Sequence, residues 1–394
     1  MRSKVYIFLF LLLASFKLFA QFTLRIEITA TPASHKEDTI FVAGNFNNWN
    51  AGDTNYIFKK ENGKLVIEIK NLPLDTYQFK FTRGSWQKTE STDKGVMTEN
   101  KVVRLFSDAT LQYTVDGWAD DYAVAKKHTA SQNVHIIDTA FFMPQLNTSR
   151  RIWIYLPQGY ANGKKEYPVM YLHDGQNLFD EMSSAFGSEW GVDECLDSLI
   201  AKGKPACIVV GIDNGQATRM SEYNPYEFTW KDSTQSKIFL PQGNEYLSFL
   251  IKTLKPFIDK KYRTLSSKEN TIIAGSSMGG LISYYAALKY PDVFGKAGVF
   301  SPAFWTAPQI KSLTDSVAKK INAKFFFYMG ENEGGTYVED MKDVAERLGS
   351  NSNTMIYSVI DAEGNHNEKA WRKWFAEFYK WVMADGYNNV IKLE

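Results

Sequence analysis

Short apolar runs and longer amphipathic stretches alternate along the chain from about residue 133 onward. The runs are typical of buried strands, and stretches whose apolar residues recur every three or four positions are typical of helices. Strands are expected at 151–156, 168–172, 206–212, 271–274, 296–300, 324–329 and 355–360, and helices at 191–202, 244–262, 280–289, 337–348 and 368–384. Because 208–212 and 325–328 are continuously apolar, their strands should be buried on both faces of a mostly parallel sheet. Residues 133–394 are therefore predicted to form an α/β domain.

The first part of the chain has a different pattern, with short runs of alternating or β-branched residues separated by turn-forming clusters. These runs predict strands at 23–29, 39–43, 64–69, 77–82 and 101–106. Their spacing is that of a small antiparallel sandwich, so residues 21–116 are predicted to be an all-β, immunoglobulin-like domain. The polar and charged residues 117–132 are interpreted as a linker.

Residues 1–20 have the pattern of an export signal. A positively charged start is followed by an apolar run at 5–16 and a small residue, Ala20, where cleavage is expected. The run is shorter than the about 20 residues that a membrane-spanning helix needs, and no later stretch is long and apolar enough. We therefore predict a signal peptide, a periplasmic or secreted product, and no stable membrane insertion.

Composition narrows the classes of partner and cofactor that the chain is expected to use. The 394 residues are 44% apolar, which is enough for about two packed domains. The formal net charge is +1, so no long-range field favours nucleic acid as a partner. The five histidines form no metal-binding motif and no cluster with the two cysteines, so the sequence predicts no metal and no cofactor. Whether Cys195 and Cys207 pair is left open.

A G-x-S-x-G motif occupies residues 275–279, between the expected strand 271–274 and a helix-like stretch at 280–288. This order is that of a nucleophile elbow, in which glycines permit a sharp turn that exposes the central serine. The motif predicts Ser277 as a nucleophile and an α/β-hydrolase fold.

A serine nucleophile needs a base, and the base needs a carboxylate, in the chain order serine, acid, histidine for this fold. His366 is the one histidine after Ser277 in the sequence, and it follows the last expected strand. The acid is expected after the preceding strand, where Glu333 is preferred to Glu331 because of its spacing from the strand end. Asp361 is a weaker alternative.

The oxyanion of an acyl-transfer reaction needs two N–H donors. One is expected at Met278, directly after the nucleophile, and the other at Gln176, in the loop that follows strand 168–172. Gly175 would allow close backbone approach there. His173 precedes the serine in the chain, so it is interpreted as an orienting or hydrogen-bonding residue.

Four separated motifs, at 171–180, 211–214, 275–280 and 364–366, together resemble those of the esterase D-like esterases. That group includes the feruloyl and acetylxylan esterases of carbohydrate esterase family 1, the enterochelin esterases and the mycolyltransferases. The resemblance implies the same nucleophile, base and acid as above, although many relatives have aspartate as the acid. It also implies substrate-binding candidates near the cleft, with structural ion pairs and packing as the alternative role: His173, Asp174, Arg219, Glu222, Tyr223 and Trp305.

The first half resembles a carbohydrate-binding module of the glycogen-binding, early-set type, through residues 44–49, 72–81 and 84–86. The resemblance implies that Trp49, Lys80 and Trp86 form a saccharide platform. The alternative is that the tryptophans fill the core of the sandwich, and we favour this alternative over binding of starch or glycogen.

The function predicted first is a secreted serine esterase that removes feruloyl or acetyl groups from plant polysaccharide or oligosaccharide through an acyl-enzyme. A siderophore trilactone esterase is the alternative within the same chemistry. A third hypothesis, of another class, is a non-catalytic carbohydrate-binding protein that keeps the hydrolase fold as a scaffold.

Overall fold

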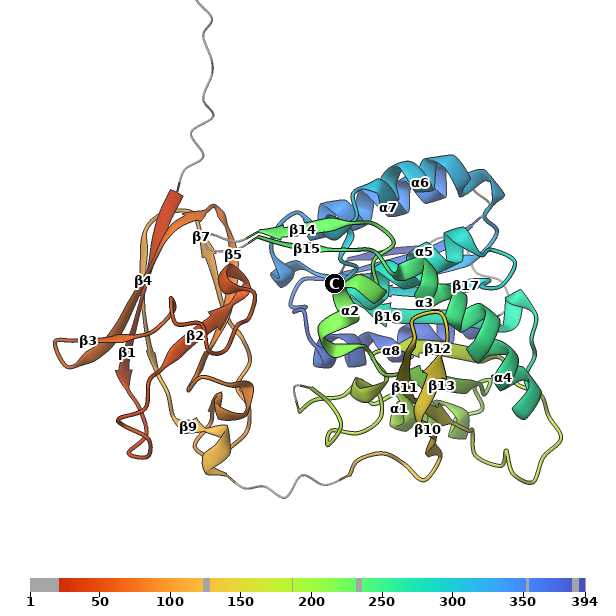
Figure 1. Cartoon of the computed structure of the whole chain (residues 1–394), viewed down its shortest axis with the longest axis horizontal. Coiled ribbons are helices and arrows are strands. Elements are labelled where there is room, and N and C mark those ends of the chain that lie inside the picture. The colour runs from red at the N-terminus through yellow and green to blue at the C-terminus, as the bar shows by residue number, and fades with distance from the viewer. Residues whose placement is uncertain are drawn as a thin grey trace, which may run out of the picture. The chain divides into compact units, whose positions relative to one another are not determined.

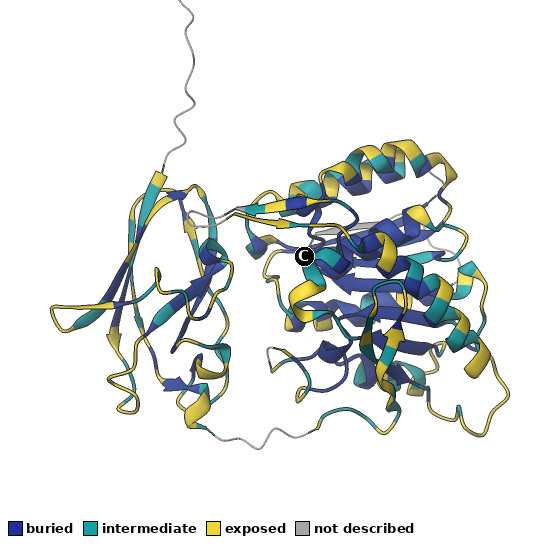
Figure 2. Ribbon diagram, viewed as in Figure 1, coloured by how far each residue is buried: buried dark blue, intermediate teal, exposed yellow. Residues whose placement is uncertain are grey.

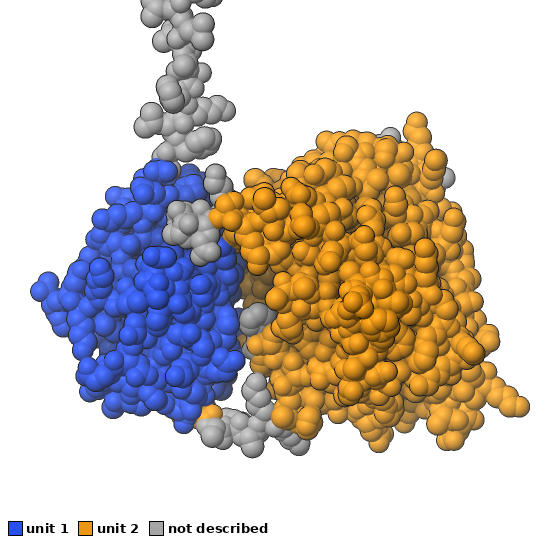
Figure 3. Space-filling view, in the orientation of Figure 1, with its two compact units in different colours: residues 1–121 blue, residues 122–394 orange. Residues whose placement is uncertain are grey.

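The structure is a computed structural model of the chain, and it describes residues 21–122, 128–185, 187–231, 236–351, 354–384 and 390–393. The chain divides into two compact units, Met1–Asp121 and Tyr122–Glu394, which Figure 3 colours separately. The predicted signal peptide, residues 1–20, lies outside the described residues. Within the described part of the chain, every helix is too short or too polar to cross a membrane.

Unit 1 is built from strands and short 3₁₀ helices in the part of it that the structure describes (Figure 1). One sheet has the order β3-β4-β1-β8, a second β2-β5-β7, and β6 pairs with β9. The strands are β1 (Gln21–Ala30), β2 (Phe41–Gly44), β3 (Lys59–Glu61), β4 (Lys64–Pro73), β5 (Asp75–Thr82), β6 (Glu90–Ser91), β7 (Lys101–Leu105), β8 (Ala109–Thr114) and β9 (Gly117–Trp118). Apolar residues of β1, β4 and β5 form its buried core. The immunoglobulin-like class of this unit stays a prediction.

The predicted linker begins too early. Its first residues form β9, which pairs in antiparallel fashion with β6, and Trp118 is only 1% exposed. Because polar aspartates follow Trp118 in the sequence, the local pattern did not indicate that this indole is buried. Residues 123–127, the middle of the predicted linker, lie outside the described residues.

Unit 2 contains a nine-stranded mixed sheet in the order β10-β11-β13-β12-β16-β17-β18-β19-β20. The strands are β10 (Val134–Met143), β11 (Thr148–Tyr155), β12 (Val169–His173), β13 (Ile208–Ile212), β16 (Thr271–Ser276), β17 (Lys296–Phe300), β18 (Lys324–Gly330), β19 (Met355–Asp361) and β20 (Val390–Leu393). The strands from β13 to β20 along this order are parallel, whereas β10 and β11 pair in antiparallel fashion. A hairpin of β14 (Phe228–Lys231) and β15 (Ser236–Phe239) stands outside this sheet.

Helices cover the sheet, and its central strands are buried (Figure 2). The helices are α1 (Val192–Ala201), α2 (Arg219–Glu222), α3 (Gly243–Phe249), α4 (Lys255–Lys261), α5 (Met278–Lys289), α6 (Gln309–Val317), α7 (Tyr337–Asn351) and α8 (Glu368–Met383). Along β13, Ile208 and Val210 belong to one buried cluster and Val209 to another, because successive side chains point to opposite faces. The expectation of a sheet buried on both faces is confirmed.

Some elements differ from the sequence pattern. The helix expected at 244–262 is α3 and α4 joined by a π-helical segment, Leu250–Leu254, because a wider turn inserts a residue into the helical repeat. Helix α6 and the β14–β15 hairpin were not predicted, although Ile310 of α6 and Phe228 of β14 belong to the buried core.

Candidate active site

Ser277 occupies the sharp turn between β16 and α5. Its φ of 59° and ψ of −121° lie in a region that non-glycine residues rarely adopt. Its N–H donates to the Phe300 carbonyl (2.9 Å), and its carbonyl accepts from Ala303 N–H (3.1 Å). A Cβ on Gly280 would lie 2.7 Å from the Phe300 carbonyl oxygen, so that position needs a glycine. The turn is therefore held against the end of β17.

His366 contacts a buried carboxylate. Its Nδ1 lies 2.7 Å from Glu333 Oε2, and the Glu333 side chain is 1% exposed whereas that of His366 is 40% exposed. The other oxygen of Glu333 accepts from Ser301 Oγ (2.6 Å) and from Gly330 N–H (2.9 Å). Glu331 is exposed, and Asp361 accepts from Lys373 (2.9 Å) and Trp374 (2.8 Å). Of the three acids considered from the sequence, the structure thus gives Glu333 the contact with His366.

Ser301 is a member of this network that the sequence did not reveal. It accepts from Trp371 Nε1 (2.9 Å) while it donates to Glu333. The Trp371 ring packs edge-on against His366, with centroids 5.2 Å apart. These contacts fix the acid and one side of the imidazole together.

These residues follow successive parallel strands. Ser277 follows β16, Ser301 follows β17, Glu333 follows β18 and His366 follows β19. The carboxyl ends of parallel strands meet at the same edge of a sheet, where catalytic groups gather in α/β folds.

The loop after β12 carries the expected second oxyanion donor. It forms a short 3₁₀ helix, Gly175–Asn177, in which Gln176 is buried and its Oε1 accepts from Asn214 N–H (3.2 Å). A Cβ on Gly175 would lie 2.8 Å from the Ile212 carbonyl carbon, so only glycine fits against β13. Met278 is the first residue of α5, whose opening N–H groups have no acceptor within the helix.

His173 lies beneath the elbow and is buried, with its Nδ1 2.8 Å from the Tyr246 hydroxyl. Burial lowers the pKa of His173 to about 3, which keeps the imidazole neutral. A Cβ added to Gly279 would lie 3.2 Å from the His173 Cβ. The ring therefore packs against the elbow as a neutral residue.

Asp174 and Arg219 form a partly buried two-contact ion pair, with Nε–Oδ1 and Nη2–Oδ2 distances of 2.7 and 2.8 Å. Asn214 Nδ2 also donates to Asp174 (2.6 Å). Burial opposes ionisation of Asp174, but the guanidinium outweighs it and holds the carboxyl pKa below its usual value. Arg219 further approaches the Ser276 carbonyl at 3.4 Å, so the pair joins the β12 loop to the elbow.

Glu222 and Tyr223 have structural partners. Glu222 is buried and accepts from Arg150 and from Thr218 Oγ1 (2.5 Å). Tyr223 is fully buried, and its hydroxyl accepts from Asp174 N–H (3.4 Å). These contacts correspond to the structural alternative considered from the sequence.

Trp305, in contrast, is 40% exposed in the loop after β17. Its ring lies edge-on to Trp230 of β14, with centroids 5.2 Å apart, and parallel to Tyr337 at 6.5 Å. Trp305 lies two residues after Ala303, whose N–H binds the Ser277 carbonyl. The three rings therefore form an aromatic surface that begins in the same loop.

Glu368 is a second residue that the sequence did not reveal. It is buried at the start of α8, two residues after His366, and accepts from Asn177 Nδ2 (3.2 Å). Burial raises the pKa of Glu368 to about 7. The contact connects the histidine loop with the loop that carries Gln176.

In unit 1, Trp49 and Trp86 are half-buried and pack against each other, with ring centroids 6.2 Å apart. They are absent from the buried cluster, which contains Trp118 instead. Lys80 is 9% exposed and donates to the Thr98 carbonyl. The two tryptophans therefore form a partly exposed pair, and Lys80 is held inside the unit.

Two other groups of side chains bear on disulfide formation and on metal binding. Cys195 and Cys207 are free thiols, so the pairing left open from the sequence does not occur in the structure. Among the described residues, one group of three acidic side chains is close enough to hold a metal ion: Glu189, Asp193 and Glu194.

The mixed sheet and the strand–turn–helix elbow together define an α/β-hydrolase-like protein. Residues 144–382 match the family described as "Putative esterase", which is more than half of the chain. The chain therefore belongs to this esterase family and is a carboxylic ester hydrolase.

Relatives by sequence include an uncharacterized Bacillus subtilis protein, YbbA, which is 27% identical over 60% of this chain and 93% of its own length. An endo-1,4-beta-xylanase/feruloyl esterase of Xylanibacter ruminicola is 31% identical over 40% of this chain and 20% of its own. An iron(III) enterobactin esterase of Dickeya dadantii is 27% identical over 43% of this chain and 34% of its own. The chain thus spans a minor part of the last two.

Among solved structures, the enterobactin esterase FES of Shigella flexneri is similar with a TM-score of 0.53 and 15% identity. The similarity covers 87% of each chain, which is more than unit 2 alone. At this identity the likeness shows the fold.

Proposed function

We propose that the protein is a secreted serine esterase that removes acyl groups such as feruloyl or acetyl from plant polysaccharide or oligosaccharide. The observation that carries the proposal is the 2.7 Å contact between His366 Nδ1 and the buried Glu333, at the sheet edge that Ser277 also occupies. A nucleophile, a base and an orienting carboxylate are the parts that acyl transfer needs.

Each part has a role in this reaction. Glu333 fixes the tautomer with the proton on His366 Nδ1, which leaves Nε2 to accept the Ser277 hydroxyl proton. Ser277 Oγ then attacks the ester carbonyl, and the N–H groups of Met278 and Gln176 stabilise the oxyanion. The imidazolium returns the proton to the leaving alcohol. Water, activated by the same imidazole, releases the acid from the acyl-enzyme.

An aromatic acyl group is favoured by the exposed ring of Trp305. The ring stands in the loop that binds the Ser277 carbonyl, and Trp230 and Tyr337 extend the aromatic surface. Aromatic rings pack favourably against one another in offset or edge-on arrangements. The feruloyl esterase relative supports the same substrate class.

Unit 1 is proposed to bring the enzyme to carbohydrate through Trp49 and Trp86. Their partial exposure suits stacking on the C–H faces of a sugar ring. Lys80 is left out of this surface because its ammonium is engaged inside the unit.

A siderophore trilactone esterase is the second candidate function. Sequence similarity to an iron(III) enterobactin esterase favours it, and so does the fold similarity to another enterobactin esterase over more of the chain than unit 2. A catecholate group is also aromatic, so the surface around Trp305 suits both candidates. A non-catalytic carbohydrate-binding role does not fit the chain, because it is an ester hydrolase.

Hydrolysis of methyl ferulate, acetylated xylan and an enterobactin-type lactone by the purified protein tests these proposals. Under the first proposal, kcat/KM should be higher for methyl ferulate or acetylated xylan than for the lactone. A clear preference for the lactone would establish the second candidate instead. Equal rates on all three would remove the case for either substrate class.

A further inference from the structure

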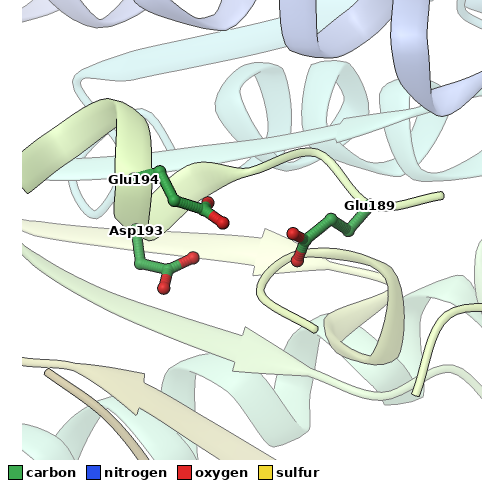
Figure 4. Close-up of side chains that lie close together, drawn as sticks. All are labelled: Glu189, Asp193 and Glu194. Carbon is green, nitrogen blue, oxygen red and sulfur yellow. The ribbon is translucent and has the colours of Figure 1, made fainter. Parts of the chain in front are cut away.

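Three carboxylates converge where the chain enters α1, on the segment before the helix and on its first turn (Figure 4). Glu189 precedes the helix, and Asp193 and Glu194 belong to its first turn. One oxygen from each lies within 4.8 Å of the other two. None of the three is part of the reaction proposed above.

Two of these carboxylates are buried with oxygens that have no partner. Glu189 is 1% exposed and Asp193 is fully buried. Glu189 Oε2, Asp193 Oδ1 and Glu194 Oε2 are inaccessible and accept no hydrogen bond in the described structure. The other Asp193 oxygen accepts from Ser131 N–H (2.6 Å), so the unpartnered one is free to bind a ligand. Buried charged oxygens without partners are costly, which points to a missing positive group.

Cationic side chains in the described part of the chain compensate little of this charge. Arg372 of α8 lies 3.9 Å from Glu189 Oε1, and its side chain is 44% exposed. Three acids this close therefore need either a bound proton or a cation.

We propose that Glu189, Asp193 and Glu194 bind a divalent metal ion, and that this ion is Ca²⁺. All three donors are carboxylate oxygens, which hard cations prefer. Ca²⁺ takes about six to eight oxygen ligands at about 2.3–2.6 Å in a flexible geometry, so carboxylate oxygens within 4.8 Å of one another can share one ion. Mg²⁺ requires near-octahedral geometry at about 2.0–2.1 Å and usually keeps several waters, which a cluster with two buried carboxylates suits less well.

The ion would have a structural role. Trp190, between the first two ligands, packs against Phe300 (5.0 Å between centroids) and against Trp371 (5.7 Å). Trp371 in turn binds Ser301. A cation at the three carboxylates would thus fix the start of α1 and the tryptophan that supports this packing.

The full-length protein, treated with a chelator and desalted, provides the test. We expect it to retain about one Ca²⁺ per chain after incubation with CaCl₂ and gel filtration. Its Tm should rise by about 5 °C with saturating Ca²⁺, because a ligand that binds only the folded state stabilises it. Mg²⁺ should give a smaller shift at the same concentration.

Glu194→Gln is the main variant, because this partly exposed position tolerates a neutral isostere. It should lose the retained Ca²⁺ and the Tm shift, as should Glu189→Gln. Glu181→Gln, at an exposed acid of the preceding loop, should keep both. The proposal is overturned if the wild type retains no Ca²⁺, if the shift survives in both Gln variants, or if only a fall in pH from 8 to 6 raises the Tm, which would indicate a bound proton instead.

Discussion

Two histidine environments in unit 2 show what separates a proposed catalytic base from a packing residue. His173 ends the parallel strand β12 and His366 follows the parallel strand β19, and each ring lies near an oxygen through Nδ1, at 2.8 and 2.7 Å. His173 faces a neutral tyrosine hydroxyl in a closed core, whereas His366 faces a buried carboxylate and has a side chain that is 40% exposed. Burial disfavours a proton gained by His173, whereas the carboxylate of Glu333 lies against the ring of His366. The two regions thus differ in the charge of the group that contacts the imidazole and in the exposure of the imidazole to solvent.

Replacing each histidine is expected to separate the two roles. His366→Ala should lower kcat for p-nitrophenyl acetate by on the order of 10⁴-fold or more, because the base is lost while the fold remains. Its Tm should stay close to that of the wild type. An active His366→Ala protein would contradict the assignment of this histidine as the base.

Replacing the proposed acid, Glu333, should have the next largest effect on kcat. Glu333→Gln should lower kcat by about 10³- to 10⁴-fold, because a neutral amide neither fixes the tautomer nor stabilises the imidazolium. Glu331→Gln is the matched control, since this side chain is exposed two residues away. Rate measurements on both variants check the assignment, which is wrong if Glu331→Gln is the more damaging change.

The hydroxyl of Ser301 is expected to contribute a smaller effect. Ser301→Ala removes one hydrogen bond to the Glu333 carboxylate and one from Trp371. Hydrogen bonds to charged groups contribute about 1.5–3 kcal/mol, so kcat should fall by about tenfold or more. The pH–rate profile should shift with it, and a variant that loses only thermal stability would show that Ser301 has no role in positioning the acid.

The chain order of the candidate site was predictable because the elbow and the histidine are local signals. The glycines around Ser277 and the position of His366 after the last expected strand were sufficient to nominate both. The choice between Glu331 and Glu333 depends on which side chain turns inward, and that is a property of the folded loop.

Other parts depend on contacts between distant segments. Ser301 and Glu368 have no motif of their own, because their roles come from Trp371, 70 residues from Ser301, and from Asn177, 191 residues from Glu368. The two-sided burial of the sheet followed from its apolar runs, whereas the β14–β15 hairpin is too short to give a pattern. The buried Trp118 in a polar segment likewise shows that tertiary packing overrides local composition.

Stability should respond to pH through His173. Its folded-state pKa is lowered to about 3, so the unfolded chain binds the proton first as the pH falls below about 6.5. This group alone should therefore lower the free energy of unfolding by about 1.4 kcal/mol per pH unit below that value. Glu368, with a raised pKa, acts in the opposite direction between about pH 7 and 4.5.

The difference between wild type and His173→Gln isolates that contribution, since Glu368 is common to both. Urea unfolding at pH 7 and pH 5 should show a steeper loss of stability in the wild type. Equal losses in the two proteins would mean that His173 is not held neutral by burial.

The smallest effect is expected at the aromatic surface. Trp305→Ala should raise KM for methyl ferulate by about two- to tenfold, as expected for the loss of an aromatic contact of about 0.5–1.5 kcal/mol. The KM for p-nitrophenyl acetate is expected to change less, because its acyl group is small. Equal changes for both esters would count against an aromatic acyl site at Trp305.

The central claim, that Ser277 is a nucleophile activated by His366, is tested most directly by its covalent reaction with a fluorophosphonate. Mass spectrometry of the digested protein should locate one phosphonyl group per chain on Ser277, with a labelling rate that falls by orders of magnitude in His366→Ala. A label on another residue, or an equal rate in that variant, would contradict the account.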